Sequence, residues 1–187
     1  MGPALRYGHL FNVAPPPLSR EVILVVLPHW DHMVRDVLQA IREVDWPKPV
    51  KIKFHPTMDW RAYKRTIPHK FSITSEPLQK LIFQAFMVVG GGTGAMLEAA
   101  SLGIPVVNFI KPKSFIHECM PEIGKGIIWD QANEAGEIGK IITQFQKTLD
   151  ENPERLKEEG ARLKSLYFAE PTDELIGQAF GLRKGLN

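Results

Sequence analysis

Cysteine is nearly absent from this sequence of 187 residues, since Cys119 is the only one. A single cysteine excludes an internal disulfide and a cysteine metal cluster, and it favours a reducing compartment. Apolar runs are short, and none reaches the roughly 18 residues that a membrane-spanning helix needs. The first residues also lack the charged-then-apolar layout of a signal peptide. We therefore expect a cytoplasmic protein without a membrane span.

Charge of one sign is also lacking. The formal net charge is +2, and basic and acidic residues are interspersed without a lysine or arginine block. This pattern argues against a nucleic-acid partner. With 44% hydrophobic and 24% charged residues, the composition is that of an ordinary soluble globular chain. The length allows one good-sized domain.

Several ligand motifs are missing. The glycine cluster at 90–94 is not followed by Gly-Lys-Ser/Thr, so it is not a Walker loop, and it is not a clean G-x-G-x-x-G fingerprint. No Asp-x-Asp pair is present that would hold a metal beside a diphosphate. His29 and His32 flank Asp31, but no third ligand of matching spacing follows them. We therefore predict no metal site.

The most informative stretch runs from residue 86 to residue 110. An apolar run at 86–89 leads into the glycine cluster, strong helix formers fill 95–102, and a second apolar run spans 105–110. This order predicts a strand, a glycine turn, a helix and a second strand, which is a βαβ unit of minimal length. Both strands are apolar on both faces, as parallel strands between helix layers are.

The glycine turn is the candidate for chemistry. Gly91, Gly92 and Gly94 let backbone N–H groups approach a ligand, and Thr93 can cap the helix or donate to a phosphate. Glu98 is the only charge between Thr93 and Leu102, and a lone carboxylate there suits the two hydroxyls of a ribose. The alternative is that the glycines only tighten the turn and that Glu98 lies in water.

The rest of the chain continues the alternation of strands and helices. Residues 1–20 contain the run Pro15–Pro17 and are predicted to form a linker or arm, followed by one domain over 21–187. Further strands are expected at 21–27, 50–54, 71–74 and 126–130, and helices at 33–44, 59–65, from Ser75 as the cap to 85, at 134–149, after Pro153 and at 172–182. This pattern predicts an α/β fold with three layers, α/β/α, around a mostly parallel sheet.

Two further residues follow predicted strands directly. His55 ends the strand at 50–54 and is fixed by Pro56, and Lys111 follows the strand at 105–110. Doubly wound folds bind ligands at the carboxyl ends of their strands, so either side chain could contact a phosphate. A solvated turn is the alternative for both residues. His29 follows the first strand in the same way.

The sequence resembles the C-terminal, nucleotide-binding domain of two-domain GT-B glycosyltransferases, in particular those that make surface carbohydrates and capsules. It is also similar to the non-hydrolysing UDP-N-acetylglucosamine 2-epimerases, which share the fold. The matching segments are Lys53–Pro56 and Val88–Val107, the latter especially in Gly91–Gly94, Leu97–Ala99 and Leu102–Val107. The resemblance implies that a nucleotide-sugar is a substrate and that no separate cofactor is needed.

The resemblance also implies roles for individual residues. His55 would approach the diphosphate, Gly92, Thr93 and Gly94 would cradle it, and Glu98 would bind the ribose hydroxyls. Apart from the resemblance, the charge of Lys111 or Lys113 could neutralise the leaving phosphate. The acceptor-binding N-terminal domain, which often supplies the catalytic base, has no counterpart here, so no catalytic residue is assigned. We expect a fragment that is inactive alone and that is able to self-associate through the surface left uncovered.

Three alternatives remain open. An epimerase of the same fold would eliminate and re-add the nucleotide within one site. A non-catalytic module would keep the fold and could lose nucleotide affinity. A flavodoxin-like or dinucleotide-binding protein is disfavoured, because Glu98 lies inside the helix after the glycines and not at the end of the next strand.

Overall fold

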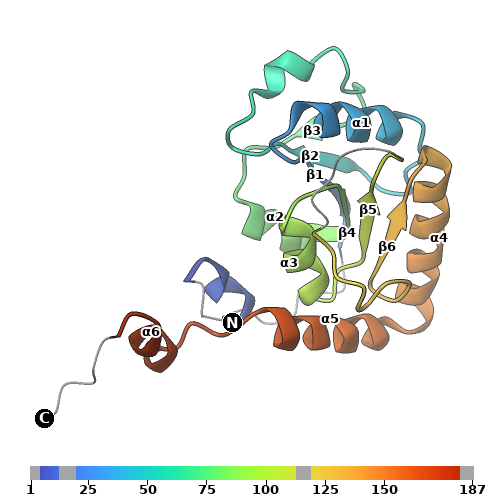
Figure 1. The fold of residues 1–187 in the computed structure, drawn as a ribbon. Helices are drawn as coiled ribbons and strands as arrows, with labels where there is room; N and C mark the ends of the chain where they lie inside the picture. Colours follow the sequence, from blue (N-terminus) through green and yellow to red (C-terminus); the bar gives the residue numbers. More distant parts are fainter. Residues whose placement is uncertain (1–4, 13–19, 113–118, 182–187) are drawn as a thin grey trace, which may run out of the picture.

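One parallel sheet forms the centre of the molecule. The computed structural model describes residues 5–12, 20–112 and 119–181. Within this part of the chain, six strands pair in parallel in the order β3-β2-β1-β4-β5-β6 (Figure 1). They are β1 (Val22–Val26), β2 (Val50–Lys53), β3 (Ser72–Ile73), β4 (Ala85–Gly90), β5 (Val106–Phe109) and β6 (Trp129–Ala132). The expected α/β fold around a parallel sheet is confirmed.

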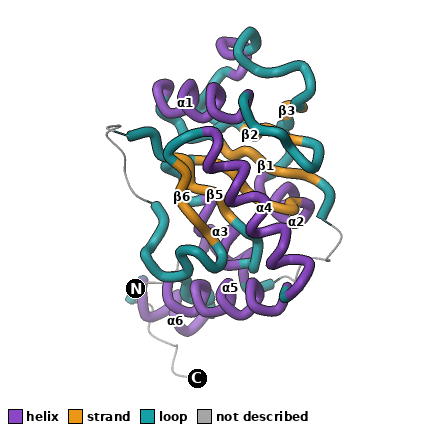
Figure 2. Tube along the Cα trace, turned by 90° about the vertical axis from the view of Figure 1, so that its right-hand side faces the viewer, coloured by secondary structure: helices purple, strands orange, loops and turns teal. Residues whose placement is uncertain are grey.

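Helices cover both faces of this sheet. Ile23 and Val25 of β1 face a core shared with α1 (Asp31–Arg42) and α4 (Ala135–Glu151). Leu24 and Val26 face a second core, shared with α2 (Leu78–Gln84), α3 (Ala95–Ser101) and α5 (Pro153–Tyr167). Burial on both faces explains the continuous apolar runs of the strands. The layers are therefore helix, sheet and helix (Figures 1 and 2).

The direction of winding reverses between β1 and β4. From β1 the chain adds β2 and β3 on one side, and it then crosses over to add β4, β5 and β6 on the other. The loops after β1 and β4 consequently leave the sheet side by side and turn to opposite faces. Open α/β sheets bind ligands at such a switch point, beside the carboxyl ends of the strands.

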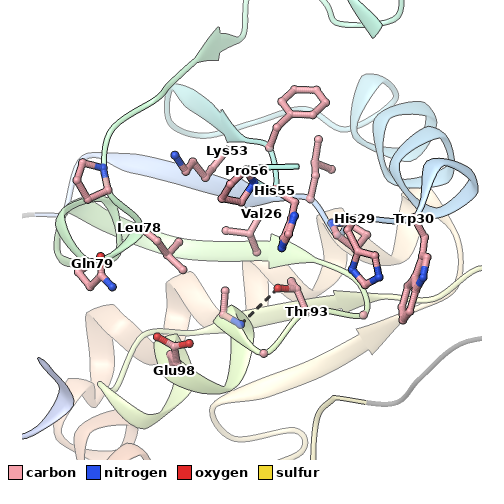
Figure 3. Close-up of a pocket in the computed structure, with 17 residues that line it drawn as sticks. Val26, His29, Trp30, Lys53, His55, Pro56, Leu78, Gln79, Thr93 and Glu98 are labelled. Atoms are coloured by element: carbon pink, nitrogen blue, oxygen red, sulfur yellow. Dashed lines mark hydrogen bonds between the residues drawn. The ribbon is translucent and has the colours of Figure 1, made fainter. Parts of the chain in front are cut away.

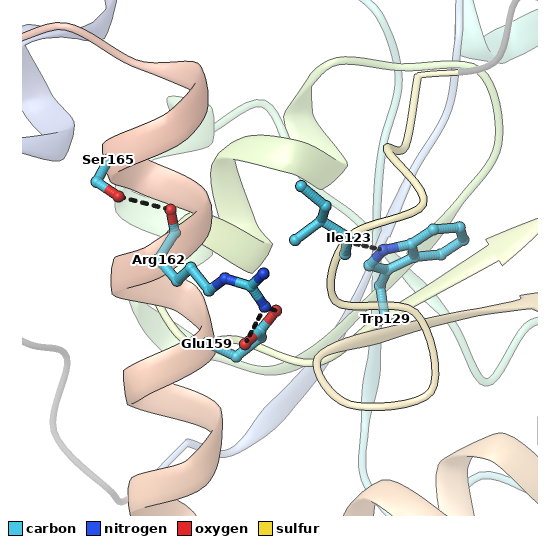
Figure 4. A network of polar contacts seen from close by, with 5 residues as sticks. All are labelled: Ile123, Trp129, Glu159, Arg162 and Ser165. Carbon is cyan, nitrogen blue, oxygen red and sulfur yellow. Dashed lines mark hydrogen bonds and ion pairs between the residues drawn. The ribbon is translucent and has the colours of Figure 1, made fainter.

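Several predicted element ends are displaced by a few residues, such as those of α1 and α6 (Asp173–Ala179). The start of β6 and the cap of α2 differ most clearly. The strand expected at 126–130 begins only at Trp129, because Gly124 and Gly126 take φ values of 82° and 73° and form a turn. The Gly124 carbonyl accepts the N–H groups of residues 127–129, and the Trp129 indole donates to the Ile123 carbonyl at 2.9 Å (Figure 4). Ser75 does not cap α2, which starts after Pro77 without a side-chain cap.

The helical turn at residues 5–10 packs on the domain. A short 3₁₀ helix, η1 (Leu5–Leu10), lies near α5 and α6 (Asp173–Ala179) in Figure 1. Leu10 is only 1% exposed, and the Tyr7 ring meets the edge of Phe168 at a centroid distance of 4.8 Å. The run Pro15–Pro17 lies outside the described residues. The domain boundary at residue 20 stays a prediction.

Candidate functional site

A pocket of about 610 Å³ opens at the switch point. Its walls come from the loops after β1, β2 and β4, from the first turn of α2 and from α3 (Figure 3). The lining residues are Val26–Trp30, Lys53–Pro56, Pro77–Gln79, Gly92–Ala95 and Glu98. The volume lies within the range of roughly 300–1,000 Å³ that small-molecule sites have.

The pocket brings together five of the seven predicted site residues, namely His55, Gly92, Thr93, Gly94 and Glu98. Gly91 does not line it, and a Cβ at Gly91 would lie 2.4 Å from the Phe109 carbonyl oxygen, so this glycine fits against the end of β5. Lys111 lies apart from the pocket and forms an ion pair with Asp36 of α1 at 3.0 Å. The ligand roles of all seven residues stay predictions.

The glycine turn forms one wall. Gly92 has a φ of 62°, a conformation that favours glycine. A Cβ there would lie 2.6 Å from Met33 Cε, the end of a flexible side chain that can move aside. A Cβ at Gly94 would meet nothing within 4 Å, so the backbone there borders open space. Thr93 Oγ1 accepts the N–H of Ala95 at 3.4 Å (Figure 3). The turn can therefore present backbone N–H groups to the pocket.

Glu98 lies in the wall of the pocket and is only 3% exposed. The alternative that this carboxylate lies in water is therefore wrong. His9 of η1 approaches it, with 3.1 Å between His9 Nε2 and Glu98 Oε2. Sequence reasoning did not find this pair, because nothing in the local pattern relates residues so far apart. The pair joins the N-terminal segment to the pocket.

His55 is oriented by its own turn. The backbone N–H of Thr57 donates to His55 Nδ1 at 3.3 Å, and Thr57 Oγ1 lies 2.7 Å from the same nitrogen. An Nδ1 that accepts the backbone N–H of Thr57 requires the neutral imidazole to carry its proton on Nε2. In Figure 3 the ring points toward Thr93 across the pocket. His55 can therefore donate an Nε2–H bond to an anion between these residues.

The pocket contains three residues to which the sequence assigned no firm role. The His29 ring lies 4.3 Å from the Trp30 ring and 5.5 Å from the His55 ring, measured between centroids. Lys53 adds a charged amine, which donates to the Ser75 carbonyl at 3.2 Å. Lys53 ends β2, whereas His29 and Trp30 lie in the loop between β1 and α1. Their place at the carboxyl ends of neighbouring strands is the signal that could have found them.

The His29-x-x-His32 segment does not assemble a metal site in the structure. The Asp31 carboxylate accepts from Arg35 Nε at 2.8 Å and from the Tyr63 hydroxyl. These hydrogen bonds, first that of Arg35, lower the pKa of Asp31. Among the described residues, no three His, Cys, Asp or Glu side chains group as a metal site would require. Likewise, no helix in the described ranges is both long and apolar enough to cross a membrane.

The fold has clear counterparts among solved structures, whereas no protein-family model and no curated protein matches the sequence. Anabaena HepE, solved with UDP and glucose, has a TM-score of 0.63 at 10% identity, over 93% of this chain and 54% of that one. A glycosyltransferase from Rickettsia africae has a TM-score of 0.63 at 12% identity, over 97% and 54%. CalG4, the calicheamicin glycosyltransferase, has a TM-score of 0.57 at 19% identity, over 92% and 45%.

These matches have two consequences. The chain spans about half the length of the solved chains that it matches. At identities this low, the likeness concerns the fold. The chain has the fold of one half of a GT-B glycosyltransferase, which confirms at the level of the fold the resemblance found in the sequence.

Proposed function

We propose that the pocket binds the nucleotide part of a nucleotide-sugar, and that the chain is the donor-binding half of a glycosyltransferase in surface carbohydrate biosynthesis. One observation carries this proposal. His55 after β2, the glycine turn after β4 and Glu98 in α3 are separate in the sequence and line one pocket at the switch point. HepE, whose structure contains UDP and glucose, supports the choice of ligand.

Each side chain has a chemical role in this proposal. Glu98 accepts hydrogen bonds from the ribose hydroxyls, because a buried carboxylate is an acceptor for two donors. His55 Nε2–H and the N–H groups of Gly92–Gly94 donate to the diphosphate, and Lys53 supplies a positive charge. As the sugar is transferred, negative charge grows on the leaving nucleoside diphosphate, and these fixed donors stabilise it.

The acceptor half belongs to the proposal as well. GT-B enzymes bring donor and acceptor together in the cleft between their two halves. This chain spans about half the length of its solved counterparts. We therefore propose that an acceptor-binding half, which contributes the catalytic base, completes the enzyme. The nucleotide-sugar is a substrate in this scheme, and no separate cofactor is required.

The test is nucleotide binding by the whole chain. A ¹⁵N-labelled sample is titrated with UDP, CDP, CMP, GDP and ADP, and amide shifts are recorded. We expect saturable shifts at residues 53–57 and 92–98 with one of these nucleotides. Glu98→Gln and His55→Ala should each weaken binding about tenfold or more, because each removes a charge-assisted or buried hydrogen bond.

A matched control separates the site from the general effect of losing a histidine. His69 is exposed and outside the pocket, so His69→Ala should bind as the unaltered chain does. Unchanged affinity in both Glu98→Gln and His55→Ala would contradict the proposed site. Steady product formation from a nucleotide-sugar by this chain alone would contradict the proposal that an acceptor half is missing. Product formed without an acceptor would favour an epimerase.

A further inference from the structure

A second cavity lies beside the amino ends of the strands, whereas the proposed nucleotide pocket lies beside their carboxyl ends. It has a volume of about 380 Å³. Arg20 precedes β1, Phe86 begins β4 with Ala85, and Gly103 precedes β5, so all three mark the amino ends of the strands. Charged residues surround it, namely Arg20, Lys48, Lys157, Glu21 and Asp150.

Arg20 is the unusual member of this group, because it is only 7% exposed. Its Nη1 donates to the Gly103 carbonyl at 3.3 Å, while its buried Nε has no hydrogen-bond partner among the described residues. No carboxylate in those residues forms an ion pair with it. A buried charge is costly unless a counter-charge and hydrogen bonds compensate it. One backbone carbonyl leaves the charge of this guanidinium without a counter-charge and its Nε without an acceptor.

Burial disfavours the charged form and lowers the pKa of Arg20 to about 10. The side chain is still a cation at neutral pH. An arginine held charged in a cavity wall, with a fork of N–H donors, is suited to planar or tetrahedral oxyanions.

The other charged groups of the cavity are Lys48, Lys157, Glu21 and Asp150. Lys48 Nζ lies 5.0 Å from the centroid of the Phe86 ring, and Lys157 Nζ contacts Glu154 Oε1 at 2.6 Å. On the acidic side, Asp150 Oδ1 accepts from Gln146 Nε2 at 2.9 Å within α4, and Glu21 is exposed. Three cations and two carboxylates line the cavity, and Glu154, outside that lining, neutralises Lys157. Arg20 and Lys48 are therefore the cavity's cations without an ion pair among the described residues.

We propose that this cavity is an anion site, in which Arg20 binds a small molecule bearing a phosphate or carboxylate group. Lys48 adds to the attraction, Lys157 is already neutralised by Glu154, and Asp150 opposes the attraction. The volume is near the lower end of the range for ligand sites, which favours a small anion over a nucleotide-sugar. The site is separate from the nucleotide pocket and does not depend on the function proposed for that pocket.

The test uses the ¹⁵N-labelled whole chain and two probes, inorganic phosphate and malonate, at low ionic strength. We expect saturable amide shifts at Phe86, Gly103 and Lys157 with one or both probes, and the stronger probe identifies the oxyanion class. Arg20→Met should abolish these shifts, and Arg20→Lys should weaken binding about tenfold, because lysine lacks the fork of donors. Lys140→Met, on the exposed side of α4, is the charge-matched control and should change nothing.

Two variants at the rim of the cavity keep the test decisive even if Arg20→Met does not fold. Lys48→Met should weaken binding, and Asp150→Asn should strengthen it, by a few-fold each. A purely structural role of Arg20 predicts neither effect. The proposal is overturned if neither probe gives saturable shifts at millimolar concentration, if the shifts persist in folded Arg20→Met, or if both rim variants leave the affinity unchanged. Nucleotide-induced shifts at residues 92–98 report separately on the other pocket.

Discussion

Tyr63 shows how one buried hydroxyl gives the chain a pH dependence. It is a buried residue at the end of η2 (Trp60–Tyr63), and its hydroxyl donates to Asp31 at the start of α1. Burial, and then the hydrogen bond to the Asp31 carboxylate, raises the pKa of Tyr63 to about 12. The phenol therefore holds its proton more tightly in the folded chain than in the unfolded chain.

The sign of the effect follows from this difference. Below about pH 10 the phenol is protonated in both states, and between about pH 10 and pH 12 only the unfolded chain loses the proton. Stability should therefore fall across this window. Tyr63→Phe should remove on the order of 1 kcal/mol of that alkaline loss, measured as the change in urea unfolding free energy between about pH 8 and about pH 11.

The matched control is Tyr167→Phe, which removes a tyrosine hydroxyl outside this cluster and should leave the alkaline profile as it was. An alkaline loss of the same size in Tyr63→Phe would show that other groups cause it.

Single residues also show what sequence can reveal of a site. His55, Thr93 and Glu98 could be predicted because each has a fixed place relative to the end of a strand, and the parallel sheet brings such ends together. The pairing of His9 with Glu98 could not, because it depends on how a distant segment packs. Lys111 also follows a strand, yet it forms an ion pair with Asp36 of α1. The sequence does not reveal this ion pair, because it depends on how α1 packs against the sheet.

At the scale of elements, α3 and α5 approach unusually closely. A Cβ at Gly160 of α5 would lie 2.5 Å from the Gly103 nitrogen and 2.7 Å from the Ala100 carbonyl oxygen. Both neighbours are backbone atoms, which cannot move aside as a flexible side chain can. Gly160 thus sets the distance between α5 and the helix that contains Glu98.

Gly160→Ala should therefore destabilise the fold by about 1–3 kcal/mol through overpacking, measured by urea unfolding. Gly139 in α4 is the control, because a Cβ there would meet nothing within 4 Å. Gly139→Ala should stabilise the chain by about 0.5–1 kcal/mol, since alanine is the better helix former. A stability gain in Gly160→Ala equal to that in Gly139→Ala would mean that the helices separate without cost.

Elements were predictable where a single pattern governs them. The sequence predicts β1, β4 and β5 from their continuous apolar runs, because these strands are buried on both faces. It predicts α1 and α4 from apolar residues at helical spacing, because each helix buries one face. The start of β6 was misplaced, because two glycines with positive φ turn the backbone before Trp129, and composition alone does not reveal φ. At the start of β6, a glycine turn therefore replaces the first residues of the strand that the apolar pattern predicts.

At the scale of the whole molecule, apolar side chains remain uncovered near the C-terminal helices. Phe180 is 69% exposed and Leu166 is 49% exposed, and Leu175 of α6 is also exposed. None of the residues of α6 is buried. Exposed apolar side chains favour association. The expected self-association stays a prediction, and these three residues are the candidates for its contact surface.

We expect the sedimentation coefficient of the chain to rise with concentration. A Leu166→Ser, Phe180→Ser double variant should lower this dependence, because it removes exposed apolar area. Lys140→Met serves as a surface control. A sedimentation coefficient independent of concentration in the unaltered chain would rule out self-association through this surface.

The strand order also has a consequence for synthesis on the ribosome. β1 is flanked by β2 and β4, and β4 ends at Gly90, far downstream of Val26. Because translation adds about 5–20 residues per second, one edge of this apolar strand stays unpaired for several seconds until β4 has been synthesised. Unpaired edges of that kind attract other chains. The nascent chain should therefore be a client of chaperones until residues 85–90 have left the exit tunnel.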